Sequence, residues 1–143
     1  MKNNDTIRYQ QWLPDVYQAL LKVNPAISAA GLDRGLQHLV HLRASQINGC
    51  AFCVKMHTRE AREAGETNER LDRLVVWHHV DDYTAAEKAA LAFTEAMTRL
   101  DDQSALPELR AALREHFTEQ QVAALGADIA MINLWNRIAI SSH

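Results

Sequence analysis

The sequence is poor in the residues that interrupt helices and in cysteine. Its 143 residues include only five Gly, three Pro and two Cys, and it contains no compositionally biased tract. With 48% hydrophobic and 23% charged residues, the composition is that of a globular protein rather than a disordered one. The length is typical of one domain with one hydrophobic core, which we expect to span residues 1–143 without the help of disulfide staples.

Several functional classes lack their usual signals. No apolar run approaches the roughly 18 residues of a membrane span, and the start, "MKNNDTIRYQQW", has no signal-peptide core, which predicts a cytoplasmic protein. A net charge of -3 with scattered basic residues gives no electrostatic reason to expect nucleic acid or an anionic membrane as the partner. Gly-rich phosphate loops, nucleotide fingerprints and acidic metal clusters are also absent from the sequence.

What the chain does have is helical periodicity. Apolar residues recur at spacings of three and four almost throughout, without convincing alternation of apolar and polar β-branched residues. This pattern predicts an all-α, single-domain bundle of about six to seven helices. Asn24-Pro25 is expected to end the first helix, and Asp33 to cap the second. We expect helices over about residues 12–23, 34–48, 50–64, 68–77 and 85–100, then one opened by Ser104 and Pro107, and a last one over about 118–140.

The last predicted helix is apolar nearly all the way round. Val122, Leu125 and Ile129 fall on one side, while Met131, Trp135 and other apolar residues cover most of the rest. Such a helix is either central to the domain or part of a subunit interface. Asn133, Asn136 and Arg137 interrupt it, and buried polar groups there need hydrogen-bond partners from loop backbone or from a neighbouring subunit.

The two cysteines lie in "SQINGCAFCVKMHTREA", residues 45–61. On a helix, Cys50, Cys53 and His57 stack within about 60° of each other, on one face. In a reducing compartment such a pair is typical of redox, catalytic or metal sites, although two buried core thiols would have the same spacing. A helix N-terminus would favour Cys50 as the nucleophilic thiolate, whereas His57, one turn away, would favour Cys53. The spacing alone leaves both assignments open.

Zinc is the main alternative to redox chemistry. Cys50, Cys53 and His57 offer three ligands, and His38, His41, His78 or His79 could supply a fourth, which would make the protein a zinc-stabilised binding or assembly module. The second close pair of ligands that is usual in structural zinc sites is missing. On the helix before the cysteines, His38, His41 and Ser45 form a polar face, which is usually solvated. The turn at Asn48-Gly49 nevertheless folds this helix back beside the cysteines, so His38 is a candidate to share the site.

The segment "LVHLRASQINGCAFCVKMHTREAREAG", residues 39–65, strongly resembles the core motif of the alkylhydroperoxidase D-like proteins in the carboxymuconolactone decarboxylase superfamily. Looser similarity extends through "AAEKAALAFTEAMTRL" and "INLWNRIAI". The resemblance implies an all-helical fold assembled as trimers or hexamers, and a thiol-dependent peroxidase that needs no cofactor beyond its redox-active disulfide. It implies that Cys53 is the peroxidatic cysteine, Cys50 the resolving cysteine and His57 a proton relay, with a dithiol reductant such as a lipoyl-bearing protein as partner.

The chain departs from the family pattern at one relay position. Twelve residues before the first cysteine the family typically carries a glutamate, and here His38 stands there, with His41 where arginine is common. Histidine can relay protons near neutral pH, but a neutral His38 would orient His57 less strongly than a carboxylate, and a charged one would repel its protonated form. A lactone decarboxylase activity is suggested only by the superfamily name. The decarboxylases proper do not use this cysteine pair, so the pair favours thiol chemistry over decarboxylation.

Overall fold

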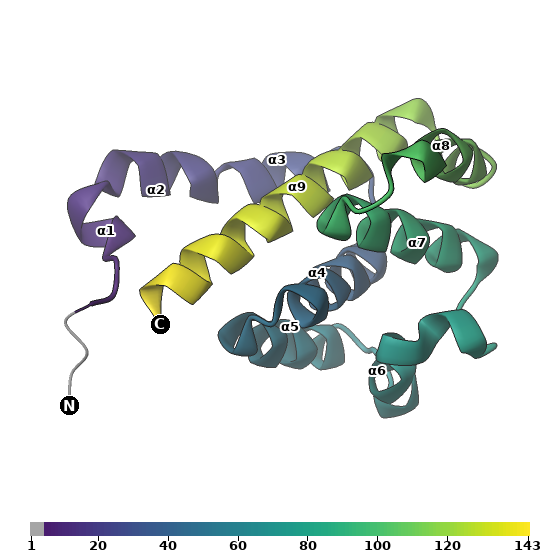
Figure 1. Cartoon of the computed structure of the whole chain (residues 1–143), viewed down its shortest axis with the longest axis horizontal. Helices are drawn as coiled ribbons and strands as arrows, with labels where there is room; N and C mark the ends of the chain where they lie inside the picture. The colour runs from purple at the N-terminus through teal and green to yellow at the C-terminus, as the bar shows by residue number, and fades with distance from the viewer. Residues whose placement is uncertain (1–4) are drawn as a thin grey trace.

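The protein is all-helical, as predicted. The computed structural model describes residues 5–143, and this range contains no β-strand (Figure 1). The elements in chain order are α1 (Tyr9–Trp12), α2 (Pro14–Leu21), α3 (Val23–Ser28), α4 (Arg34–Asn48), α5 (Ala51–Glu63), α6 (Asn68–Arg73), the 3₁₀ helix η1 (Leu74–His79), α7 (Ala85–Arg99), the 3₁₀ turn η2 (Gln103–Ala105), α8 (Leu106–Arg114) and α9 (Glu119–Ser142). They form a single domain.

Local signals set most of the helix ends. Asp33 caps α4 by accepting a hydrogen bond from the Leu36 backbone N–H, and Thr84 opens α7 in a capping box with Glu87. Gly49 ends α4 in the left-handed region, with φ of 68°. There glycine is favoured because it has no Cβ to clash with the following carbonyl. These boundaries agree with the sequence-based expectations.

Three helices have other boundaries in the structure than the sequence predicts. The first is interrupted before Val23, and Asn24-Pro25 does not end it, because both residues lie in the first turn of α3. A proline is tolerated there, since the first-turn N–H groups have no intrahelical acceptor. The fourth turns into 3₁₀ helix after Arg73, and Val76 has non-helical backbone angles. Ser104 lies in the turn η2, so that α8 begins at Leu106.

Helix α4 separates two hydrophobic clusters. Leu36 and Val40 pack in one cluster with residues of α3, α7, α8 and α9, while Leu39 and Leu42 pack in another with residues of α5, α6, η1 and α7. All four leucine and valine side chains are at least 95% buried. Two faces of α4 are therefore occupied by apolar packing, and the third face carries its polar residues towards α9 and α5.

Helix α9 is central to the domain. It runs diagonally across the molecule, with α2 and α3 along one side and α4 and α5 along the other (Figure 1). It contacts α3, α4, α5, α7 and α8, which explains why its apolar residues are not confined to one face. The central position accounts for the buried apolar residues of this helix, Ala124, Leu125, Ile129 and Ile132, while Ile140 near its end remains 47% exposed.

Candidate active site

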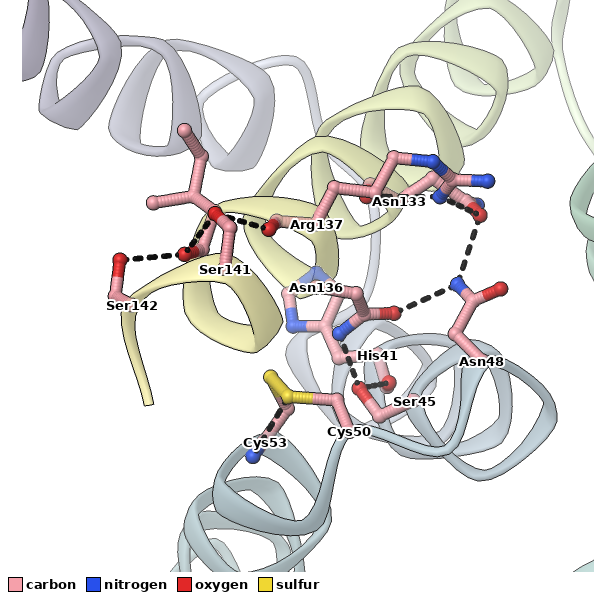
Figure 2. Close-up of a disulfide and its surroundings, with 11 residues drawn as sticks. His41, Ser45, Asn48, Cys50, Cys53, Asn133, Asn136, Arg137, Ser141 and Ser142 are labelled. Carbon is pink, nitrogen blue, oxygen red and sulfur yellow. Dashed lines mark hydrogen bonds between the residues drawn. A yellow bond between two sulfur atoms is a disulfide. The ribbon is translucent and has the colours of Figure 1, made fainter. Parts of the chain in front are cut away.

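The two cysteines lie at the start of α5. Cys50 is the N-cap residue, and its sulfur accepts a hydrogen bond from the Cys53 backbone N–H at 3.3 Å. The two sulfurs form a disulfide, and each cysteine is only 2% exposed (Figure 2). Cys53 is the third residue of the helix, so both sulfurs lie within its first turn. The positive end of the helix dipole is therefore close to both thiols and does not by itself select Cys50.

One face of α5 points inward, as its spacing predicts. Cys53, His57 and Ala61 are all buried along this face, whereas Phe52 is 50% exposed. The small Ala61 packs in the second hydrophobic cluster, and this contact holds α5 against α4. The face that carries the cysteine and the histidine is thus turned inward and has little contact with bulk water.

His57 is held in its neutral form in the disulfide state. Burial, followed by the nearby His41, lowers the pKa of His57 to about 4. Glu60 opposes this shift, because its carboxylate lies 3.3 Å from His57 Nδ1. The balance favours the neutral imidazole at neutral pH, and a neutral imidazole can accept a proton from a neighbouring thiol.

The polar face of α4 is not solvated, contrary to the usual expectation for such a face. The His41 ring lies with its centroid 5.1 Å from that of His57, and His41 Nε2 is 2.8 Å from Asp128 Oδ1 on α9. Ser45 is fully buried. Polar groups of α9 replace water as the hydrogen-bond partners of His41 and Ser45. Burial, followed by the charge of His41, lowers the pKa of His38. His38 and His57 line the same groove, so the two sequence candidates share one site.

Asp128 is a member of this site that the sequence analysis missed. It is 1% exposed and approaches the site from α9. The available signal was a single acidic residue in the otherwise apolar stretch "VAALGADIAMINLW". Buried carboxylates need a cationic or hydrogen-bonding partner, but which residue supplies it was not evident without the tertiary structure.

Buried amides join α9 to the turn between α4 and α5, as Figure 2 shows. Asn136 is fully buried, donates a hydrogen bond to Ser45 Oγ and accepts one from Asn48 Nδ2, both at 2.9 Å. Asn48 Nδ2 also donates to Asn133 Oδ1 at 2.9 Å. Both asparagines have hydrogen-bond partners, as predicted, but the partners are mainly side chains of α4 and not the loop backbone that was expected. These bonds fix the turn that presents Cys50.

A groove of about 880 Å³ reaches the cysteine pair from the surface. Cys53, His57, His41 and His38 lie along it, together with apolar and aromatic side chains that include Tyr17, Leu21, Phe52, Met56, Trp135 and Ile138. Cys50 is not among the residues that line it. The groove therefore gives a small organic molecule access to the Cys53 side of the disulfide.

The zinc alternative receives no support from the geometry. Within residues 5–143, no group of three or more His, Cys, Asp or Glu side chains is arranged to hold a metal ion. His78 and His79 lie in η1, with their rings edge to face against each other.

None of the helices within residues 5–143 is both long and apolar enough to cross a membrane.

The lowered pKa of His57 makes stability depend on pH. The unfolded chain binds a proton at this histidine below about pH 6.5, whereas the folded disulfide form binds it only below about pH 4. Protons therefore favour unfolding, and the free energy of unfolding should fall by about 2 kcal/mol between pH 7 and pH 5 through this group. Urea titrations of the oxidised protein at both pH values would measure the fall. The variant His57→Gln should lose most of it, and an equal fall in that variant would contradict the assignment.

Comparison with known proteins places the chain in a family. Residues 14–96 match the model of the carboxymuconolactone decarboxylase family. The protein YdfG of Bacillus subtilis is 36% identical over 135 residues, which are 94% of this chain and 92% of YdfG. A protein of unknown function from Agrobacterium tumefaciens, provisionally described as an antioxidant defence protein AhpD, is 34% identical, with a TM-score of 0.90 over 97% of this chain and 95% of its own.

More distant structures share the fold. A peroxidase-related protein from Ralstonia eutropha with an alkylhydroperoxidase AhpD core has a TM-score of 0.76 at 25% identity, over 92% of this chain and 70% of its own. The debrominase Bmp8 has a TM-score of 0.79 at 22% identity, over 90% of this chain and 69% of its own. From the family match, the relatives above 30% identity and the helical fold, we conclude that the chain belongs to the carboxymuconolactone decarboxylase family and is an AhpD-like member of it.

Proposed function

We propose that this protein is a thiol-dependent peroxidase that reduces organic hydroperoxides through Cys53 and Cys50. The observation that carries the proposal is the placement of Cys53. Its side chain lies on a groove open to small molecules, one helical turn from a buried histidine and within disulfide distance of a second cysteine. The similarity to the Agrobacterium protein, which is provisionally described as an antioxidant defence protein, is consistent with this proposal.

The proposed reaction has two chemical steps. The Cys53 thiolate attacks the terminal oxygen of the hydroperoxide and the O–O bond breaks. The departing alkoxide takes a proton and leaves as the alcohol, and Cys53 becomes a sulfenic acid. The Cys50 thiol then attacks the Cys53 sulfur, so that the S–O bond breaks, one water leaves and the disulfide forms. The disulfide present in the structure corresponds to the product of this second step.

The surroundings of Cys53 support formation of its thiolate. The first turn of α5 places unpaired backbone N–H groups and the positive helix end near the sulfur. After reduction, a thiolate at Cys53 would stand one turn from His57, and this negative charge would raise the pKa of His57 from its value in the disulfide form. His57 would then hold the proton that the leaving alkoxide needs. We assign His38, which lies on the same groove, as a further relay residue in place of the family glutamate.

Turnover requires that the disulfide be reduced. A dithiol can do this through a mixed disulfide, since thiolate attack on one sulfur is completed by the donor's second thiol. A lipoyl-bearing protein as the donor, and assembly as a trimer or hexamer, stay predictions from the family resemblance. The chain supplies no feature that favours lactone decarboxylation over thiol chemistry.

The direct test is a titration of the reduced protein with one equivalent of cumene hydroperoxide. We expect rapid loss of two thiols and of two hydrogens in mass, together with one equivalent of the alcohol, much faster than free cysteine reacts at the same pH. Mass spectrometry and a free-thiol assay in a quenched time course would follow it. Thiols that survive, or that oxidise no faster than free cysteine, would contradict the proposal.

A further inference from the structure

A histidine–aspartate pair lies beside the proposed relay and connects it to α9. His41 Nε2 and Asp128 Oδ1 are 2.8 Å apart. The Asp128 side chain is 2% exposed, and that of His41 is 14% exposed. A carboxylate accepts hydrogen bonds, so Nε2 is the donor, and the Nδ1 atom of a neutral His41 is left as the basic nitrogen. Asp128 thereby sets the tautomer of His41, the role that the aspartate plays in a Ser-His-Asp triad.

The second oxygen of this carboxylate has no partner. Asp128 Oδ2 is buried and makes no hydrogen bond within residues 5–143, and the buried His38 Nδ1 is also without one. An unsatisfied buried carboxylate oxygen costs folding free energy, because its hydration is lost and not replaced. An apolar residue could pack at this position without that cost. The buried charge of Asp128 therefore needs a functional explanation.

The electrostatics of the site supply that explanation. His38, His41 and His57 stand close enough that His41 lowers the pKa of each of the other two through its charge. A proton on this cluster needs a nearby anion. Glu60 is one, but its side chain is 39% exposed, whereas that of Asp128 is 2% exposed. Glu60 is the anion with the larger effect on His57 and His38, whereas Asp128 is the anion in direct contact with His41. Because Asp128 is buried, its charge is little screened by solvent.

We infer that Asp128 is a positioning residue of the relay: through its hydrogen bond to His41 it orients that ring towards His57, and its buried charge allows the His41–His57 pair to hold a proton near Cys53. The inference rests on the proposed peroxidase function. In this arrangement Asp128 on α9 supplies the negative charge that a glutamate at the position of His38, on α4, would otherwise supply.

Other titratable groups face the pair and enter any pH profile. His38 and Arg34 belong to α4 and Glu60 to α5, while across the groove lie Arg8, Tyr9, Tyr17 and His143. The variant Asp128→Asn, described below, changes none of these groups. A shift in the titration of the His41–His57 pair in that variant therefore measures the effect of the Asp128 charge.

The test is the isosteric variant Asp128→Asn, which keeps an oxygen that can accept from His41. Histidine titrations followed by NMR should show the higher of the two apparent pKa values of the pair falling by roughly one unit or more. With cumene hydroperoxide, kcat/KM should fall roughly tenfold to a hundredfold, and the alkaline limb of its pH profile should move to lower pH. The control variant is Glu119→Gln, on the same helix, where the Glu119 side chain is 75% exposed. It should leave the apparent pKa values of the pair, kcat/KM and the pH profile unchanged.

The outcomes separate this inference from the proposed function. An unchanged pair pKa in Asp128→Asn would overturn the inference whether or not the wild type is active. A lowered pKa without any change in kcat/KM or in the pH profile would overturn it as well. Absence of turnover in the wild type would instead overturn the peroxidase proposal, and the role of Asp128 with it. If Asp128→Asn fails to fold, His41→Gln should show the same fall in kcat/KM, and otherwise the coupling is refuted.

Discussion

Replacing Cys53 by serine is expected to lower hydroperoxide turnover by at least about a thousandfold, because the serine hydroxyl is not ionised at neutral pH and cannot attack the O–O bond. Cys53, and not Cys50, lines the groove. The substitution changes one buried atom and should leave the fold intact. A coupled assay with a dithiol reductant and cumene hydroperoxide would measure the loss, with a circular dichroism spectrum to verify folding.

The matched variant Cys50→Ser should behave differently. Its Cys53 should still reduce one equivalent of hydroperoxide and stop as a sulfenic acid, detectable by mass or by a dimedone adduct, since no resolving thiol is available. Undiminished turnover in Cys53→Ser would contradict the assignment of the nucleophile. A single turnover by Cys53→Ser and none by Cys50→Ser would show that the two roles are reversed.

The variant His57→Gln is expected to reduce kcat/KM for cumene hydroperoxide by about 10²- to 10⁴-fold, the usual contribution of a general acid–base residue. His57 is 7% exposed, and it lies one turn from Cys53 on the inward face of α5. Glutamine fills a similar volume but neither stabilises the thiolate by charge nor returns a proton to the alkoxide. The kcat/KM pH profile of the variant should also lose the limb that reports this histidine.

A matched control for His57→Gln is His78→Gln. His78 lies in η1, is exposed, and is absent from the residues that line the groove. The same chemical change there should leave both the rate and its pH profile as in the wild type. A His57→Gln protein with the wild-type rate and pH profile would exclude His57 as the proton donor.

The helical architecture and the cysteine–histidine face could be predicted because both depend on local spacing. Positions 50, 53 and 57 share a face of any regular helix, whatever packs against it. Caps such as Asp33 and Thr84 likewise act within one turn. The errors at Asn24-Pro25 and after Arg73 arose where local signals are ambiguous. Proline is compatible both with ending a helix and with its first turn, and a 3₁₀ segment has nearly the same spacing as an α-helix.

The sequence by itself therefore determined the all-α class and the shared face of Cys50, Cys53 and His57. The tertiary structure alone decided what meets that face. A polar stripe such as His38, His41 and Ser45 has the same spacing whether it faces water or another polar surface. Its partner Asp128 is 87 positions from His41 along the chain. Contacts over such a distance depend on how α9 crosses α4 and α5, and no local pattern encodes that crossing.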